Sequence, residues 1–338
     1  MEIAVIGAGS WGTALACMLA EKNYHVNLWV RGSELYKEMK LKGVNPYYLP
    51  GIKLPEKLKP TLNIEEAVRG KRYVFLVVPS HAVRETAALV KPYLASPVVL
   101  VNAAKGLETG TYLRLSQVIG DELEGHDDYR IAVVSGPNHA EEVSSKVPSA
   151  TVVASCWQET AQEIQEILMT PAFRTYTNSD LVGVEIGGAL KNIIALGSGI
   201  IEGLGMGDNT RAALLTRGLV EIIRLGNALG ARGRTFTGLS GLGDLFVTCN
   251  SEHSRNRRVG VKLGEGNRLR EILSEMNMVA EGVNTTRAAY QLTREKGVEM
   301  PITEEIYYVL YFNKDPLQAM HDLMQRAKKG EVEDIAFD

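Results

Sequence analysis

The sequence predicts a doubly wound α/β domain over residues 1–179, followed by an all-α domain over residues 180–338. Three observations support this division. In the first half, short apolar runs alternate with helical segments, which is the pattern of strand–helix–strand units. Most of these runs are almost continuously apolar, as expected for parallel strands covered by helices on both faces. From about residue 180 onward, helical spacing dominates.

The predicted strands of the first half are runs rich in β-branched residues. They cover 3–6, 26–30, 73–78, 98–102, 131–135 and 151–154, with a weaker run at 175–177. The helices between them are predicted at 11–22, 33–42, 64–69, 82–91, 112–120, 138–146 and 158–169. Residues 43–60 are expected to form a loop, because Pro46, Pro50, Pro55 and Pro60 fit neither helix interiors nor central strands. In the second half, helices are predicted at 181–202, 210–229, 267–276, 283–296, 303–313 and 315–329.

Composition and charge narrow the function classes. The chain has 45% hydrophobic and 23% charged residues, which is the balance of an ordinary globular protein. A net charge of −3 gives no basic field that would attract nucleic acid or anionic lipid. The three cysteines and six histidines form no metal-binding or disulfide pattern, so we expect no metal and reduced thiols. No signal peptide and no membrane-length apolar run is recognised, so a cytoplasmic location is expected.

A glycine-rich motif connects the first predicted strand to the first helix. Gly7-Ala8-Gly9-Ser10-Trp11-Gly12 has the form G-x-G-x-x-G, in the strand-to-helix context that this motif requires. Gly7 permits a tight turn, Gly9 leaves room for a pyrophosphate, and Gly12 lets helix and strand pack closely. Unpaired N–H groups at the helix N-terminus favour the phosphates. The motif therefore predicts a Rossmann-type NAD(P)-binding domain; the alternative is a plain glycine turn.

The end of the second predicted strand indicates which dinucleotide is bound. An NAD-selective site usually carries Asp or Glu there. Residues 27–30 contain no acid, and Arg31 follows at the strand end. Because a guanidinium suits a 2′-phosphate, we expect NADPH to be accepted and preferred over NADH. The alternative is that Arg31 is a solvated charge.

Other candidate residues follow the predicted strands at their carboxyl ends, where open α/β folds gather their chemistry. Residues 77–80 form a turn beneath the expected nicotinamide position, and Lys105 follows the run 98–102. The run 131–135 leads into a glycine turn at Gly136. Lys105 is a candidate functional residue or only a solvated charge. His139 lies near this region, but a histidine at a helix start is more often structural, so it is not expected to donate the proton.

The first helix of the second domain carries one lysine in a row of small residues. Gly183, Gly187, Lys191, Ala195 and Gly199 recur every four residues. A lone amine among small residues lies where another element or a ligand approaches closely, and desolvation there lowers its pKa. Lys191 is therefore a candidate general acid/base for a hydroxyl or carbonyl. The alternative is tight helix packing, with the lysine extending to solvent.

Two later segments complete the candidate site. Residues 238–245 form a glycine-rich loop with one carboxylate, Asp244, which is suited to hold or polarise the ammonium of Lys191; Thr248 follows one helical turn later. Residues 254–258 offer a hydroxyl, an amide and guanidiniums, which suit a phosphate or carboxylate. The alternatives are an Asp-capped turn and a solvated basic loop.

Taken in order along essentially the whole chain, these motifs resemble the bacterial-type NAD(P)-dependent sn-glycerol-3-phosphate dehydrogenases. The resemblance is carried by segments 7–16, 28–29, 104–108, 136–143, 187–192, 241–245, 254–256 and 279–282. It implies reduction of dihydroxyacetone phosphate to sn-glycerol 3-phosphate, which supplies phospholipid synthesis, by a homodimer that uses NADP or NAD. It identifies Lys191 as the acid/base, with Lys105 and Asp244 completing the polar centre.

The resemblance also implies two sets of ligand contacts. Cofactor contacts fall on Ser10, Trp11, Arg31, Lys105, Ala140, Arg255, Val279 and Glu281, beside the three motif glycines Gly7, Gly9 and Gly12. Substrate contacts fall on Lys105, Gly136, Asn138, Lys191, Asp244, Thr248, Ser254, Arg255 and Asn256, with Arg255 at the phosphate. One departure is Asn138, because the family usually has serine there; we expect altered substrate affinity rather than lost activity. The competing interpretations are a β-hydroxyacid dehydrogenase and a non-catalytic dinucleotide sensor.

Overall fold

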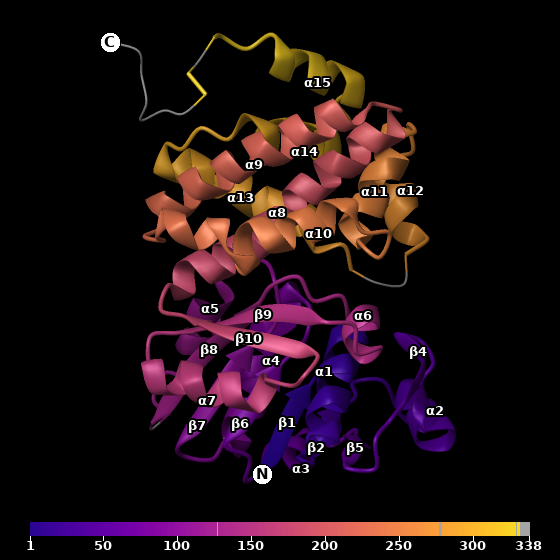
Figure 1. Cartoon of the computed structure of the whole chain (residues 1–338), viewed down its shortest axis with the longest axis vertical. Helices are drawn as coiled ribbons and strands as arrows, with labels where there is room; N and C mark the ends of the chain where they lie inside the picture. Colours follow the sequence, from indigo (N-terminus) through magenta and orange to yellow (C-terminus); the bar gives the residue numbers. More distant parts are fainter. Residues whose placement is uncertain (127, 277–278, 329, 332–338) are drawn as a thin grey trace.

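The computed structural model describes residues 1–126, 128–276, 279–328 and 330–331. A sheet with flanking helices fills the lower half of the molecule in Figure 1, and a helical bundle fills the upper half. The last strand of the sheet ends at Asn178, and the first helix of the bundle begins at Leu181. The predicted fold class, an α/β part followed by an all-α part, is confirmed. The assignment of 1–179 and 180–338 as two domains stays a prediction.

The main sheet has the order β10-β9-β8-β7-β6-β1-β2-β5. Its strands are β1 (Glu2–Ile6), β2 (His25–Trp29), β5 (Leu58–Thr61), β6 (Tyr73–Leu76), β7 (Val98–Asn102), β8 (Tyr129–Ser135), β9 (Ser149–Ser155) and β10 (Phe173–Asn178). Neighbouring strands are parallel, as expected, except that β9 runs antiparallel to β8. That reversal was not predicted. Only the short helix α6 (Ala140–Ser144) and residues 145–148 separate β8 from β9, and nothing in the apolar run itself encodes strand direction.

Helices cover both faces of this sheet, which explains the continuous apolar runs. Ile3 and Val5 of β1 pack into the core under α1 (Ser10–Glu21) and α7 (Gln158–Leu168), while Ala4 and Ile6 face the opposite core. That second core contains α3 (Ile64–Val68), α4 (Val83–Val90) and α5 (Leu115–Glu122). Successive strand residues point to opposite faces, so burial on both faces requires every position to be apolar.

The expected loop at 43–60 is wrong in part. It holds a small antiparallel pair, β3 (Val44–Asn45) and β4 (Leu49–Lys53), and the start of the edge strand β5. Pro50 lies in β4 and Pro60 in β5. Proline is tolerated on edge strands, where its missing N–H leaves no ladder bond unmade, so the prolines here mark strand edges rather than the absence of strands. Helix α2 (Ser33–Lys42) precedes this pair.

The helical domain is built around α8 (Leu181–Gly203), which is buried from Gly183 to Ile201. The expectation that no apolar run reaches membrane length is wrong for α8, which is long and apolar enough to cross a membrane. Its apolar window is buried inside the helical domain instead. Its glycines admit neighbouring backbone: a Cβ added at Gly187 would lie 2.6 Å from the carbonyl oxygen of Ser240, and one at Gly199 would overlap Arg257 O. The row of small residues is thus a packing surface for the turn Leu239–Gly243 and for α11 (Arg255–Gly264).

Other helices surround α8. They are α9 (Asp208–Ala228), α10 (Asp244–Asn250), α11 (Arg255–Gly264), α12 (Leu269–Ser274), α13 (Glu281–Lys296), α14 (Pro301–Phe312) and α15 (Pro316–Met324), and residue 329 of the last predicted helix lies outside the described residues. Two segments predicted as loops are helical instead. A π-helical turn at Leu239–Gly243 leads directly into α10, and the basic segment after Ser254 forms the first turns of α11. Both were missed because a glycine-rich run and a highly charged run hide the helical period.

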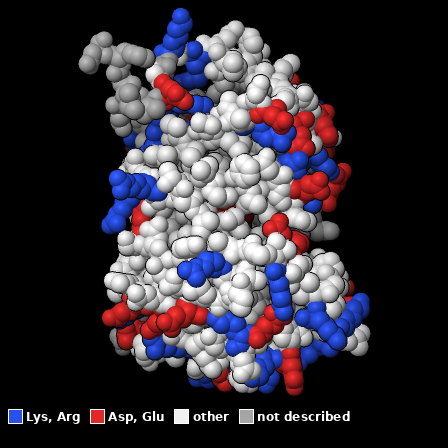
Figure 2. Space-filling view, viewed as in Figure 1, with Lys and Arg blue, Asp and Glu red and all other residues white. Residues whose placement is uncertain are grey.

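Charges of both signs are interleaved around the rim of the face shown in Figure 2, and an uncharged area covers the middle of the helical domain.

Candidate active site

A cleft of about 740 Å³ opens between the carboxyl edge of the sheet and the helical domain. Its walls come from the glycine-rich turn and the segments after β2, β6 and β7 on one side, and from α8, α10, α11 and α13 on the other. This volume lies within the usual range for a cofactor site. Residues predicted from distant parts of the sequence therefore line one cavity.

The glycine-rich turn lies at one end of the cleft and fits a dinucleotide. Gly7 has a φ of +117°, and a Cβ at Gly7 or Gly12 would overlap backbone carbonyl oxygens. A Cβ at Gly9, in contrast, would meet nothing within 4 Å. Gly9 caps α1 without a side-chain hydrogen bond, and the buried Ser10 hydroxyl has no partner in the described structure. The turn thus presents open space and free donors where the pyrophosphate is expected.

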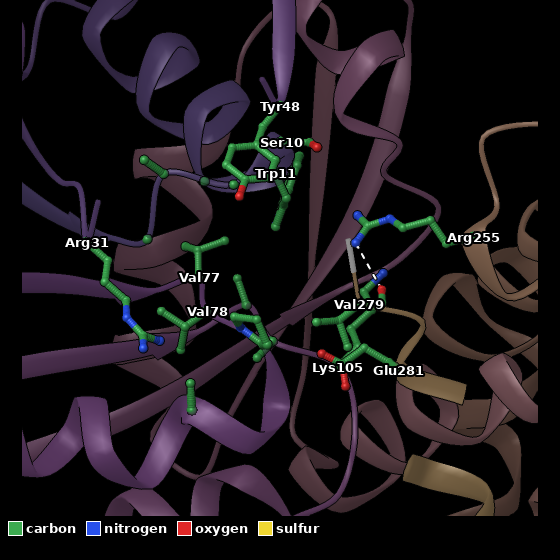
Figure 3. A pocket seen from close by; sticks show the side chains of 18 of the residues that line it. Ser10, Trp11, Arg31, Tyr48, Val77, Val78, Lys105, Arg255, Val279 and Glu281 are labelled. Carbon is green, nitrogen blue, oxygen red and sulfur yellow. Dashed lines mark hydrogen bonds between the residues drawn. The ribbon is translucent and has the colours of Figure 1, made fainter. Parts of the chain in front are cut away.

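The small strand pair after α2 is fastened to this turn through Asn45, which is fully buried. Its Nδ2 donates to the carbonyl oxygen of Ala8 at 2.9 Å and to Thr13 Oγ1 at 2.8 Å, and its Oδ1 accepts from the backbone N–H of Tyr48. In Figure 3, Tyr48 lies beside Ser10 and Trp11. Tyr47 and Tyr48, which line the cleft, were missed from the sequence because residues 43–60 were interpreted as an unstructured loop.

Arg31 lines the cleft directly after β2, on the opposite side from Arg255 in Figure 3. Val77 and Val78, which follow β6, lie between the two. Glu34, in the first turn of α2, also lines the cleft near Arg31 and was not predicted. The sequence argument looked for an acid only within β2 and at its end.

At the other end of the cleft, two lysines share one carboxylate. Lys191 is 6% exposed; its Nζ donates to Asp244 Oδ1 and, at 2.7 Å, to Thr248 Oγ1. Lys105 Nζ donates to the other oxygen, Asp244 Oδ2, at 2.7 Å, and to the carbonyl oxygen of Gly136 at 2.8 Å. Lys191 therefore does not extend to solvent, and Asp244 is not merely a cap.

Burial and charge set the pKa values of this cluster. Burial, reinforced by the positive charge of Lys105, lowers the pKa of Lys191 to about 8, although Asp244 opposes the shift. Burial alone would raise the pKa of Asp244, but the two ammonium groups outweigh it and hold that pKa below its ordinary value. The site thus contains a stable carboxylate and an ammonium group that exchanges its proton near neutral pH.

The segment 254–256 also faces the cleft. Ser254 caps α11 through its hydroxyl, and Arg255 Nη1 donates to the carbonyl oxygen of Val279 at 3.2 Å. Asn256 Nδ2 donates to Asn192 Oδ1, and Asn256 Oδ1 accepts from Gly282 N–H. These contacts fix α8, α11 and α13 relative to one another around the end of the cleft.

Asn138 lines the cleft as well, but its amide is held by protein groups. Its Nδ2 donates to the carbonyl oxygen of Ala150 at 2.9 Å, and its Oδ1 accepts from Thr151 Oγ1 at 2.9 Å. Among the described residues, Gly136, Ala140 and Asp244 do not line the cleft themselves. Gly136 and Asp244 instead accept hydrogen bonds from Lys105, which does line the cleft.

The N-terminal family model, described as the N-terminus of NAD-dependent glycerol-3-phosphate dehydrogenase, matches residues 2–161, and the corresponding C-terminal model matches residues 180–321. The chain belongs to the NAD-dependent glycerol-3-phosphate dehydrogenase family. A glycerol-3-phosphate dehydrogenase [NAD(P)+] of Moorella thermoacetica is 56% identical over 332 residues, covering 98% of both chains. One from Geobacillus kaustophilus is 52% identical, covering 99% of this chain and 97% of the relative. The crystal structure of glycerol-3-phosphate dehydrogenase from Coxiella burnetii superposes with a TM-score of 0.92 at 40% identity, covering 96% and 99% of the two chains.

The family resemblance predicted from the sequence is therefore confirmed, and the protein is an NAD(P)-dependent oxidoreductase of the glycerol-3-phosphate dehydrogenase family. Within the described residues, no group of three or more His, Cys, Asp or Glu side chains is placed to hold a metal ion.

Two further groups of this dehydrogenase lie in the cleft. Glu281 accepts from the N–H of Ser80 at 2.9 Å and from its hydroxyl, so it connects the start of α13 to the turn after β6. His139 packs against His253 with ring centroids 5.8 Å apart, and both line the cleft. Burial and the charges of Lys191 and Lys105 lower the pKa of His139 to about 4. His139 is therefore neutral at pH 7, and that it does not donate the proton stays a prediction.

Proposed function

We propose that this protein reduces dihydroxyacetone phosphate to sn-glycerol 3-phosphate, reversibly, with Lys191 as the general acid/base. The observation that carries the proposal is the buried ammonium of Lys191 at the inner end of a cleft that fits a dinucleotide. A group with a pKa near 8 changes protonation state readily at the pH where metabolic enzymes work. Family membership supplies the substrate class.

In this mechanism the bound nicotinamide supplies or accepts the hydride. Lys191 holds a proton at Nζ for the carbonyl oxygen of the ketone and takes it back in the oxidative direction. Asp244 and Thr248 fix that Nζ, so little reorganisation is needed during proton transfer. Lys105, held by Asp244 and Gly136, adds a second positive charge beside the developing oxyanion.

The substrate phosphate is proposed to bind Arg255 and Asn256, with Ser254 and Thr248 nearby. Binding this remote group orients the carbonyl for hydride transfer. The Arg255 side chain lines the cleft. Among the described residues its guanidinium makes one hydrogen bond, to Val279, which leaves other guanidinium donors for a phosphate. Because the amide of Asn138 is already held by β9, we propose that it shapes the wall of the site and shifts substrate affinity moderately.

We propose that NADPH is preferred over NADH, because Arg31 presents a guanidinium at the adenosine end of the cleft. The other proposed cofactor contacts are Ser10, Trp11, Lys105, Ala140, Arg255, Val279 and Glu281, with the motif glycines Gly7, Gly9 and Gly12. Equal dissociation constants for NADPH and NADH, or a lower one for NADH, would refute the preference.

We also propose that the protein forms a homodimer through the helical domain. We further propose that it is cytoplasmic and supplies glycerol phosphate for phospholipid synthesis. The uncharged area over this domain in Figure 2 supports such an interface, because the cores of protein interfaces are depleted of charged residues. Phe246 of the same domain is 61% exposed. Sedimentation equilibrium tests this proposal: a single species of monomer mass at all concentrations would refute the dimer.

The activity is tested by adding dihydroxyacetone phosphate to purified protein with NADPH and following oxidation of the cofactor by absorbance, with NADH in parallel. Rapid oxidation is expected. A keto acid without phosphate is the matched control: turnover of the keto acid alone would indicate a β-hydroxyacid dehydrogenase. NADPH binding without turnover of any phosphorylated ketone would indicate a dinucleotide sensor instead.

A further inference from the structure

The adenosine end of the cleft carries a carboxylate as well as a guanidinium. Arg31 and Glu34 are three residues apart, on either side of Gly32, which caps α2. Both side chains are exposed, and both line the cleft. A ligand that reaches Arg31 at this end therefore also meets the charge of Glu34.

These two charges do not neutralise each other. In the described part of the chain, neither Arg31 nor Glu34 takes part in an ion pair, whereas Glu38, one turn later in α2, pairs with Lys42. Glu34 instead acts on Tyr47, another cleft residue: partial burial raises the pKa of the Tyr47 phenol, and the negative charges of Glu34 and Glu38 raise it further. The carboxylate of Glu34 thus lines the cleft beside the Tyr47 hydroxyl, which hydrogen-bonds it, and no cation of the described residues pairs with it.

The two side chains favour opposite ligands. A carboxylate at the end of the second strand accepts hydrogen bonds from the free ribose hydroxyls of NADH, and it repels a phosphate. A guanidinium attracts the 2′-phosphate of NADPH. We propose that Glu34 is a specificity-determining residue that opposes Arg31, binding the ribose of NADH and limiting the preference for NADPH. This inference rests on the proposed binding of the 2′-phosphate at Arg31.

A second carboxylate, Glu85, also lines the cleft, and it provides a control. It belongs to α4, which follows β6, whereas Glu34 lies in the first turn of α2, near the end of β2 where this fold binds the ribose. Glu38 provides another control, because it lies on the same helix as Glu34 but does not line the cleft. If a substitution acts only by weakening α2 or by changing the overall electrostatic potential of this region, the control variants should show the same change in ligand affinity.

The experiment measures dissociation constants of 2′,5′-ADP and 5′-ADP by calorimetry for the native protein and for E34Q, R31Q, E38Q and E85Q. These two probes differ only by the 2′-phosphate and involve no chemistry at Lys191. E34Q is expected to bind 2′,5′-ADP more tightly by about three- to tenfold, which is the size of repulsion between exposed charges a few ångströms apart. It is expected to bind 5′-ADP more weakly. The gain for 2′,5′-ADP should shrink as salt is added, and the NADPH/NADH ratio of kcat/KM should rise in parallel.

The opposite signs of the two shifts separate this role from a structural one, because loss of a helix-stabilising charge would weaken both ligands. If E34Q leaves the ratio of the two affinities unchanged while R31Q lowers it, the role of Glu34 is refuted and the proposed NADPH preference stands. If R31Q leaves the ratio unchanged, the 2′-phosphate does not bind Arg31, and both are refuted. A gain in E38Q or E85Q equal to that in E34Q would also overturn the inference.

Discussion

Replacing Lys191 with methionine is the sharpest test of the proposed chemistry. Methionine keeps much of the length and volume of the lysine side chain but carries no proton and no charge. Lys191 is 6% exposed and its Nζ contacts Asp244 and Thr248 inside the protein, so methionine would occupy the same buried space without the proton.

The expected loss follows from what the ammonium does. A positioned general acid contributes about 10²–10⁴-fold, and a preorganised charge beside the oxyanion contributes about 10²–10³-fold. Because one group supplies both effects, they do not multiply fully. We expect kcat/KM to fall by about 10³–10⁴-fold, equivalent to about 4–5.5 kcal/mol in transition-state stabilisation. The cost in folding stability is expected to stay below the roughly 3–5 kcal/mol of a broken buried ion pair, since Asp244 keeps Lys105 as a partner.

The assay is initial-rate NADPH oxidation with dihydroxyacetone phosphate across pH, together with the NADPH dissociation constant. In the native enzyme, reduction needs protonated Lys191, so its kcat/KM should decline as pH rises through about 8. Oxidation of glycerol 3-phosphate needs the deprotonated amine and should decline as pH falls through the same value. The methionine variant should lose this dependence while NADPH affinity stays nearly native. The exposed Lys262, changed likewise to methionine, is the control. Turnover of Lys191→Met within tenfold of native would refute the assignment.

Three further changes test other parts of the structure. Asp244→Asn removes the charge that raises the pKa of Lys191, so the falling limb of the reduction profile should move to lower pH; an unmoved limb would argue against the coupling. Gly9→Ala should leave thermal stability nearly unchanged, because its Cβ meets nothing within 4 Å, yet weaken NADPH binding at least tenfold, about 1.4 kcal/mol; calorimetry and melting curves measure both. Burial raises the pKa of Glu221 to about 7, so its stabilising contribution is full below the unfolded-state pKa near 4.5 and is lost as pH rises through 7. In the native protein the free energy of unfolding, measured with denaturant, should therefore be lower above pH 7 than below pH 4.5 by on the order of 3 kcal/mol. Glu221→Gln should remove this difference.

Much of the sheet could be predicted because its strands are buried on both faces. Continuous apolar runs between helical segments encode that burial directly, and β7 was predicted over its full length. Strand direction depends on pairing between segments far apart in the chain, so the antiparallel β9 was not predictable from its own residues. The proline rule excluded central strands at 43–60 correctly but was extended too far, since the edge strand β5 contains Pro60.

At the candidate site, the sequence indicated one pairing, that of Asp244 with Lys191, but not the second one. Lys191 stood out because it is the only large side chain in a row of small ones, and the structure buries it on that account. That Lys105 would share Asp244 with it was not encoded locally, because the two lysines come from segments that meet only when the helical domain packs on the sheet edge. Glu34 and Tyr48 were missed because no sequence motif marks the residues of α2 and of the β3–β4 pair that line the cleft.

The carboxylate of Asp244 has a consequence beyond proton transfer. One of its oxygens binds an ammonium from the segment after β7 and the other binds an ammonium from α8, so the proposed reaction centre also connects the two halves of the chain. We therefore expect neither half to be active when expressed alone, and we expect activity to return only when the two fragments recombine. The same contacts constrain chimaeras that combine the N-terminal half of one relative with the C-terminal half of another. Such a chimaera is expected to be active only where the residues around this carboxylate are complementary in the two halves.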